Sequence, residues 1–275
     1  MKEKYTKRTF GLEIIGIALG LIFLIPFYFV LINSVKDFAE ILVDAAALPK
    51  EFLFSNYAQV WEILNFPKAF LNSLIITVFS IAGIVLISSM AAWKMVRTPG
   101  KFSNTLFILF VSAMVIPFQA VMIPLVKLGG MLGIMNSIPG IIIMYFGFGV
   151  SLSLFLFHGF VKTIPKEIEE SAKIDGASEF GIFWRIVFPL LKPITVTVII
   201  LNTLWIWNDY LLPLLVLQDA ELKTIPLATS SFFAQYTKQW DMGLAALVMG
   251  IAPIIVFFLF LQKHIIKGIA AGSIK

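Results

Sequence analysis

Enzyme chemistry needs nucleophiles, metal ligands or phosphate-binding loops, and this chain offers few of them. It contains no cysteine, which excludes a disulfide, a thiolate nucleophile and a zinc–thiolate site. It has neither the G-x-x-x-x-G-K pattern followed by Ser or Thr that binds phosphate nor the H-E-x-x-H pattern that binds zinc. Its two histidines, His158 and His264, each end an apolar stretch, which is typical of amphipathic side chains at a membrane interface. We therefore expect no catalytic residue, no metal site and no cofactor bound by this chain.

Acidic side chains gather in one segment, residues 162–193, which we call the acidic loop. They are Glu167, Glu169, Glu170, Asp175 and Glu179. We expect these carboxylates on the outer face of the loop, with the earliest ones in the first turns of a helix, where the helix dipole favours negative charge. Such a surface predicts a protein partner. The alternative is an elbow whose aromatic residues lie on lipid.

Two short helices joined by a turn are predicted within the acidic loop. Pro165 is typical of the start of a helix, and Gly176 suits the left-handed residue that ends one. Ser178 is a typical cap for a second helix, and Pro189 is expected to end it. The second helix carries an apolar stripe formed by Phe180, Phe183, Trp184 and Val187.

The composition of the whole chain indicates where these elements lie. Of its 275 residues, 59% are hydrophobic and only 13% are charged, against about 25% charged in a typical soluble domain. The mean hydropathy is +0.95. Too few charges remain for a water-facing shell, which excludes an ordinary soluble enzyme and a disordered chain. The composition predicts an integral membrane protein.

Six apolar stretches are long enough to cross a bilayer, for which a helix needs about 20 residues. We predict spans at about 12–35, 70–93, 105–126, 138–159, 194–217 and 243–262. Ser137 is the expected cap of the fourth span, and the fifth is interrupted by a polar step at Asp209. The first span is too long for the apolar region of a signal peptide, so we interpret it as a retained helix. The prediction is an all-α, polytopic membrane protein with one transmembrane domain over residues 1–275.

The positive charges predict the orientation of these spans. Fifteen of the 21 Lys and Arg residues lie in the N-terminus, in the segments 94–101 and 162–192, and in the tail after residue 262. Positive charge favours the cytoplasmic side of a membrane. Both termini and the acidic loop are therefore predicted to be cytoplasmic. The net charge of +5 is then explained by the orientation of the spans, and no nucleic-acid partner is expected.

Several polar side chains that are costly to bury in lipid fall inside the predicted spans. The candidates for a translocation pathway are Asn72, Gln119, Asn202, Asn208 and Asp209. They would form a polar lining for a hydroxylated solute; the alternative is that they stabilise helix packing. Carboxylates are otherwise scarce in the spans, and an ion-coupled carrier usually needs a relay of such groups. The sequence therefore favours an energy source outside this chain.

A longer motif within the acidic loop resembles a known family. The cytoplasmic EAA loop of ABC importer permeases has the pattern E-A-A, three residues, G, nine residues, I-x-L-P. This chain matches the pattern with intact spacing at Glu170, Ser171, Ala172, Gly176, Ile186, Phe188 and Pro189. Ser171 replaces the second-position Ala and Phe188 replaces the Leu. Both replacements are mild in size or polarity.

The resemblance covers nearly the whole chain, including Asn72-Ser73, Trp207-Asn208-Asp209-Tyr210 and Ile225-Pro226-Leu227. It points to the carbohydrate-uptake branch and to the six-span subunit of the maltose-transporter type. It implies the transmembrane domain of a type I ABC importer in a bacterial or archaeal inner membrane. The implied partners are a related permease (forming a heterodimer), two cytoplasmic ATPase subunits that carry ATP-Mg, and an extracytoplasmic sugar-binding protein.

The resemblance also assigns roles to residues of the acidic loop. Those expected to couple to the ATPase are Glu170, Ser171, Ala172, Asp175, Gly176, Ala177, Ile186 and Pro189. Hydrolysis is expected on the separate ATPase, so this chain is not itself an enzyme. Three other functions stay open: an ABC permease for another solute such as glycerol phosphate, an ion-coupled secondary carrier, and a membrane scaffold that transports nothing.

Overall fold

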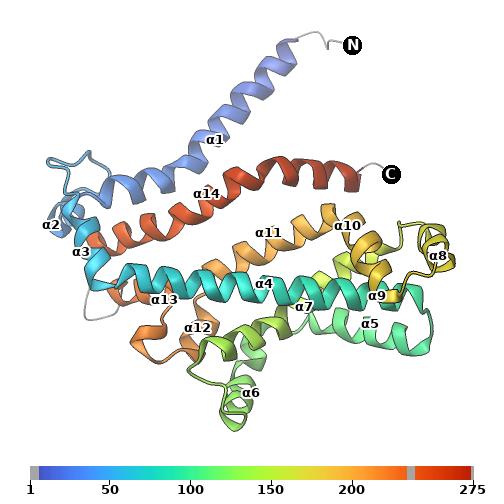
Figure 1. The fold of residues 1–275 in the computed structure, drawn as a ribbon. Helices are drawn as coiled ribbons and strands as arrows, with labels where there is room; N and C mark the ends of the chain where they lie inside the picture. The colour runs from blue at the N-terminus through green and yellow to red at the C-terminus, as the bar shows by residue number, and fades with distance from the viewer. Residues whose placement is uncertain (1–5, 234–238, 274–275) are drawn as a thin grey trace. The chain divides into compact units, whose positions relative to one another are not determined.

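The computed structural model describes residues 6–233 and 239–273, and every regular element among them is helical (Figure 1). This confirms the predicted all-α class. Four helices are long and apolar enough to cross a membrane: α1 (Lys7–Asn33), α4 (Phe66–Arg97), α7 (Ile138–Val161) and α14 (Trp240–Ser273). Two bent helix pairs have the same apolar character, so the described residues contain four to six candidate spans.

The first bent pair is α5 (Lys101–Ala113) with α6 (Phe118–Met131), which meet at 106°. The sequence predicts one helix over 105–126, and the structure differs. Pro117 has no N–H to donate to a continuing helix, and it disfavours the helical conformation for Ile116 before it. Pro117 is itself extended, with ψ of 141°. The apolar run is therefore continuous in sequence but broken in structure.

The start of α7 agrees with the sequence prediction at residue 138. The hydroxyl of Ser137 accepts a hydrogen bond from the Gly140 N–H at 3.1 Å, and Pro139 lies in the first turn. Gly133 and Asn136 precede it with φ of +66° and +53°. These left-handed residues turn the chain sharply between α6 and α7.

The segment around Asp209 contains a second interruption. Here α11 (Lys192–Asn208) ends, and two residues separate it from α12 (Leu211–Val216). Asp209 is extended, and its Oδ1 accepts a hydrogen bond from the Leu211 N–H at 3.0 Å. An aspartate that caps the next turn in this way satisfies a backbone donor that the break exposes.

The acidic loop holds α8 (Lys166–Ile174), α9 (Glu179–Ile182), a π-helical turn (Phe183–Val187) and α10 (Phe188–Leu190). The helical stretch Glu179–Leu190 meets α11 (Lys192–Asn208) at 75°, and the two form the second bent pair. Pro189 does not end the second helix as predicted, because it occupies the first turn of α10, where a missing N–H costs little. The remaining short elements are α2 (Phe38–Val43), α3 (Ser55–Ile63), α13 (Ile225–Thr229) and 3-10 turns at Ala220–Leu222 and Ser230–Phe233.

The chain divides into two compact units, Met1–Phe66 with Ala228–Pro253 and Pro67–Leu227 with Ile254–Lys275. The second, which we call the core unit, contains a continuous hydrophobic cluster built on α4, α7, α11 and the acidic loop. Gly149 of α7 allows close approach, since a Cβ there would overlap the side chain of Ile84 on α4. The first unit has a smaller cluster of Val60, Phe232, Ala245 and Ala246.

Candidate functional site

The turn between α8 and α9 has a defined local geometry. Gly176 has φ of +83°, as predicted from its place after the helix. Its N–H donates to the Lys173 carbonyl at 3.1 Å, and the Ala177 N–H donates to the Ala172 carbonyl at 3.0 Å. These two bonds are the Schellman arrangement that closes a helix end. A side chain at this left-handed position would be strained by about 1–2 kcal/mol.

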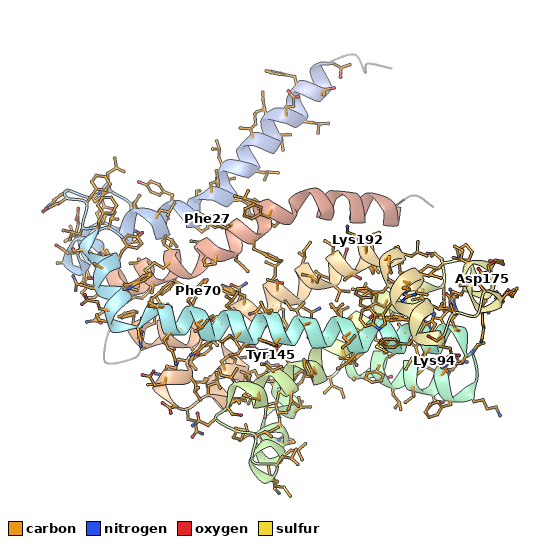
Figure 2. All side chains as sticks on the ribbon, in the orientation of Figure 1. Phe27, Phe70, Lys94, Tyr145, Asp175 and Lys192 are labelled. Atoms are coloured by element: carbon orange, nitrogen blue, oxygen red, sulfur yellow. The ribbon has the colours of Figure 1, made fainter. Side chains whose placement is uncertain are left out.

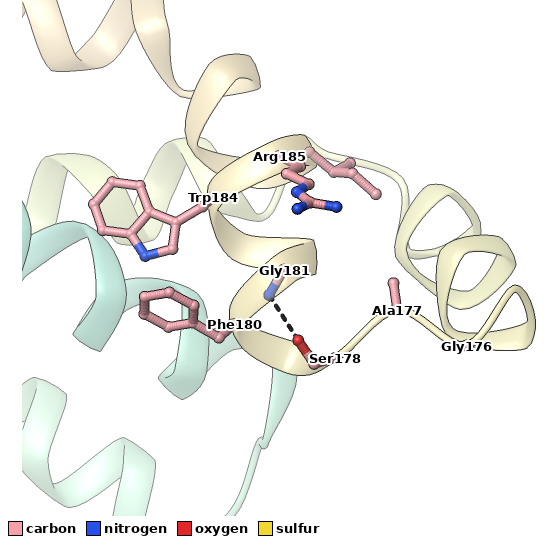
Figure 3. Close-up of a pocket in the computed structure, with 8 residues that line it drawn as sticks. Gly176, Ala177, Ser178, Phe180, Gly181, Trp184 and Arg185 are labelled. Carbon is pink, nitrogen blue, oxygen red and sulfur yellow. Dashed lines mark hydrogen bonds between the residues drawn. The ribbon is translucent and has the colours of Figure 1, made fainter.

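The second helix of the acidic loop begins with the predicted cap. The hydroxyl of Ser178 accepts a hydrogen bond from the Gly181 N–H at 3.2 Å (Figure 3). Beyond it, the Ala177–Ser178 segment and the start of α9 border a hollow of about 530 Å³, which Trp184, Arg185 and Ile186 also line. The turn and the second helix thus form one shaped, accessible surface.

The motif residues divide into three groups around this surface. Gly176, Ala177 and Ile186 border the hollow. Glu170, Ser171 and Asp175 are exposed outside it, whereas Ala172 is half-buried against the core of its unit. Pro189 is exposed in α10 and does not border the hollow.

Ile174 gives this surface an apolar tip that the sequence analysis did not single out. It ends α8 and is 87% exposed, although it is a large aliphatic residue. A single exposed apolar residue is unremarkable on most proteins. Here it stands between exposed Lys173 and Asp175, directly before the turn at Gly176.

Aromatic rings pack the second helix of the acidic loop against α4. Trp184 packs edge-on against Phe183, with ring centroids 5.1 Å apart, and lies 5.0 Å from Phe188. Phe183 also packs on Trp93 of α4 at 5.4 Å. Of the predicted apolar stripe, Phe183 and Val187 are fully buried, but Phe180 is 67% exposed. The π-helical turn at Phe183–Val187 has one residue more than an α-helical turn, so the apolar residues after Phe180 face a different direction from Phe180.

The sequence predicts Glu169 on the outer face, but its side chain is only 11% exposed and lies against the end of α4. Its Oε1 accepts hydrogen bonds from Arg97 Nε at 2.8 Å and from an Arg97 terminal nitrogen at 2.7 Å. Its Oε2 accepts from Trp93 Nε1 at 2.9 Å. The sequence contains one indication of this position: Glu169 and Ala172 are three residues apart and so lie on the same face of α8.

A second ion pair lies at the rim of the same contact. Lys94 Nζ donates to Glu179 Oε2 at 2.8 Å, and both side chains are more than half exposed. The hydrogen bond and charge of Lys94 lower the pKa of Glu179 from its ordinary value. Exposed pairs of this kind contribute little to stability, so this pair serves as a comparison for the buried one.

Two of the five pathway candidates are buried and use their amide hydrogens within the protein. Asn72 Nδ2 donates to the carbonyls of Glu221 at 2.8 Å and Lys223 at 3.1 Å. Asn202 Nδ2 donates to Ser153 Oγ at 3.1 Å and to its own helix. These contacts favour the helix-packing alternative for both amides.

The other three candidates are more accessible. Gln119 is exposed on α6, and Asn208 is exposed at the end of α11. Asp209 is half-buried, and its Oδ2 accepts a hydrogen bond from the hydroxyl of Tyr145 at 3.0 Å. Among the described residues, the hydrogen bonds of Asn72, Asn202, Asn208 and Asp209 go to partners outside the set of five candidates.

The described residues contain no group of three His, Asp or Glu side chains that would hold a metal ion. His158 stacks on Phe107, with ring centroids 3.9 Å apart. The side chain of His264 lies outside the described residues.

Comparison with known proteins gives a consistent result. Residues 83–271 match the family described as "Binding-protein-dependent transport system inner membrane component". The chain is 44% identical over 264 residues to the probable starch degradation products transport system permease protein AmyC of Thermoanaerobacterium thermosulfurigenes, covering 96% of each chain. It is 36% identical to the melibiose/raffinose/stachyose import permease protein MelC of Bacillus subtilis, covering 91% of each.

A solved structure shares the fold. It is a chain of a bacterial ABC transporter involved in the import of the acidic polysaccharide alginate. The TM-score is 0.79 at 22% identity, covering 95% of this chain and 99% of that one.

Proposed function

Because the chain belongs to the family of binding-protein-dependent transport system inner membrane components, we propose that it is the permease subunit of an ATP-driven sugar importer. Its substrates are oligosaccharides, and it forms half of the translocation pathway. Relatives named for starch degradation products and for melibiose, raffinose and stachyose, matched over more than 90% of their length, support this substrate class.

The proposal includes a specific topology. Residues 1–275 form one type I permease domain with six spans, in which α5 with α6 serves as the third span and α11 with α12 as the fifth. Both termini and the acidic loop are cytoplasmic, in a bacterial or archaeal inner membrane. The distribution of Lys and Arg supports this orientation. The chain has no native cysteine, so the accessibility of single introduced cysteines from either side of the membrane tests it directly.

The proposed partners follow from the same assignment. They are a related permease in a heterodimer, two cytoplasmic ATPase subunits that bind ATP-Mg, and an extracytoplasmic sugar-binding protein. The chain itself performs no catalysis. The acidic loop contacts an ATPase through Glu170, Ser171, Ala172, Asp175, Gly176, Ala177, Ile186 and Pro189, and closure of the ATPase pair drives alternating access by rigid-body motion.

The observation that carries the proposal is the geometry of the α8–α9 turn. Its left-handed glycine, exposed Ile174 and adjoining hollow form one shaped surface, and exposed Asp175 lies between Ile174 and Gly176. A loop that only lay on lipid would turn its apolar side chains to one face. Here Phe183 and Val187 are buried in the protein instead, and the exposed face is mixed in charge.

Reconstitution tests the function. The chain, its sister permease, the ATPase and the binding protein are placed in proteoliposomes, and uptake of labelled maltotriose or raffinose is measured with and without ATP. We expect ATP-dependent uptake that vanadate abolishes. Uptake without an ATPase, driven by an ion gradient, would instead identify a secondary carrier. ATP-dependent uptake of glycerol phosphate but not of sugars would overturn the substrate class.

Within the pathway, we propose that Gln119, Asn208 and Asp209 face the solute. Their exposure or partial exposure supports this role. Asn72 and Asn202 contribute to the pathway by stabilising the packing of the segments around it, since their amides donate to neighbouring segments.

A further inference from the structure

The helix α4 is fastened at one end to the acidic loop. The guanidinium of Arg97 gives two hydrogen bonds to Glu169, and the side chains of this pair are only 13% and 11% exposed. Arg97 also donates to the Ile164 carbonyl at 3.0 Å. Trp93, one helical turn earlier, donates to the second oxygen of the Glu169 carboxylate. We call Trp93, Arg97 and Glu169 the clamp.

The clamp holds α8 at two points. Glu169 lies within α8, and the Ile164 carbonyl lies just before its first residue. Two oxygens and a planar guanidinium fix both the position and the direction of the carboxylate, because the hydrogen bonds come from two side chains. Packing of Trp93 against Phe183 fastens the second helix of the loop to the same part of α4.

The same helix is fastened at its other end to the segment 221–225, which we call the distal segment. Asn72 donates to the carbonyls of Glu221 and Lys223, and Ser73 Oγ accepts from the Ile225 N–H at 2.9 Å. Asn72 and Ser73 are both buried. Three backbone groups of the distal segment therefore depend on one turn of α4.

Both attachments lie on the same uninterrupted helix, because α4 runs for 32 residues without a break. Asn72 and Arg97 lie roughly 37 Å apart along it, at 1.5 Å per residue. Figure 2 shows Phe70 and Lys94 toward opposite ends of α4, with Asp175 beyond the Lys94 end. Buried Ile76, Ile84 and Ala92 hold the helix in the core of its unit.

We propose that Glu169 is a positioning residue that acts through Arg97 and Trp93 to join the acidic loop to α4, and that α4 is a strut that moves the loop and the distal segment as one body. The idea rests on the proposed function, in which an ATPase displaces the loop. A displacement of the loop then reaches the distal segment without bending the helix. Coupling of this kind is reciprocal, so a binding event at the distal segment acts on the loop with the same energy.

The first experiment needs no transported solute. Spin labels are attached at Glu167→Cys and Glu221→Cys in the otherwise cysteine-free chain, within the assembled complex. Both positions are exposed. The distance distribution between the labels is compared in the nucleotide-free and ATP-bound complex. We expect one narrow distribution that ATP does not shift, and a broader one in Glu169→Gln and in Asn72→Leu.

The second experiment measures coupling in the complete reconstituted complex. The ratio of ATP hydrolysis with and without the sugar-loaded binding protein is measured, using maltotriose or raffinose, whichever the complex transports. We expect Glu169→Gln and Asn72→Leu each to lower this ratio about tenfold, within the range of typical allosteric couplings. The matched control is Glu179→Gln, which removes the exposed ion pair with Lys94 and is expected to change the ratio less than twofold.

These outcomes separate the strut from the transport function. If the wild-type complex transports nothing, the proposed function fails, and the label distances alone decide the strut. Equal distributions in wild type and Glu169→Gln overturn the strut, as does an ATP-dependent shift in the wild type. Loss of complex assembly in Glu169→Gln is checked by co-purification. Arg97→Gln, which removes the same ion pair from the α4 side, is then measured; a broad distribution supports the clamp, and a narrow one in an assembled complex contradicts it.

Discussion

The hydroxyl of Tyr145 on α7 donates a hydrogen bond of 3.0 Å to Asp209 Oδ2, at the break between α11 and α12. Tyr145 is fully buried, and its ring packs edge-on against Trp205 at 5.5 Å. The other carboxylate oxygen caps the first turn of α12 through the Leu211 N–H. One acidic side chain thus joins two elements and fixes the direction of a third.

Removing the Tyr145 hydroxyl tests the strength of this connection. We expect Tyr145→Phe to keep the fold and to lower the free energy of unfolding by about 1 kcal/mol, since hydrogen bonds between membrane helices are generally modest. Unfolding in mixed micelles measures this. Tyr28→Phe, which removes an exposed hydroxyl that donates to the Ala46 carbonyl, serves as control. If Tyr28→Phe lowers the free energy of unfolding as much or more, the hydrogen bond of Tyr145 contributes no more to stability than an exposed one.

Gly176 tests the turn of the acidic loop. Its φ of +83° disfavours any side chain, so we expect Gly176→Val to weaken ATPase binding and to lower uptake per ATP hydrolysed, with strain of about 1–2 kcal/mol. Gly159→Ala in α7 is the control, because a Cβ meets open space at both sites and only Gly176 has a positive φ. Normal coupled uptake by the Gly176 variant would contradict the assigned role.

Ile174 tests the apolar tip of α8. Because this side chain is 87% exposed, Ile174→Asp removes little that stabilises the permease itself. We expect the permease to fold normally but to bind the ATPase with a free energy weaker by about 2 kcal/mol, typical of an interface hot spot. Titration of detergent-solubilised permease with the ATPase measures this. Equal affinity of the variant and the wild type would remove Ile174 from the interface.

Asn202 and Asn208 share one helix but differ in exposure, which separates packing from transport. We expect Asn202→Leu to lower stability, because the buried amide donates to Ser153 on α7. Asn208→Leu is expected to leave assembly intact and to lower uptake, since this side chain is exposed at the end of α11. Uptake and the amount of assembled complex are measured for both. Unchanged uptake by Asn208→Leu would argue against a solute-facing role.

Glu179 gives a prediction for pH dependence. Lys94 lowers the pKa of Glu179 below its ordinary value of 4.5, so the ionised carboxylate favours the folded state. This contribution is present above the pKa of the unfolded chain and is lost as the pH falls through the lower folded value. The thermal midpoints of wild type and Glu179→Gln should therefore differ slightly near neutral pH and converge in acid. A gap that widens in acid would contradict this sign.

The sequence by itself determined the helical class and the local turns of the chain. Apolar run length predicts membrane helices, and the conformations of Gly176, Ser178 and Ser137 follow from their own backbone preferences and from neighbours a few residues away. Such features need no knowledge of packing, because all the interacting atoms lie within one or two helical turns.

Only the tertiary structure decided which polar residues meet. Glu169 pairs with a residue 72 positions away and Asn72 with one 149 positions away, so no periodicity relates the partners. The bend after α5 likewise interrupts an unbroken apolar run at Pro117. Which face of α8 is buried depends on where α4 ends beside it, and that is set by the packing of the core and not by the sequence of the loop.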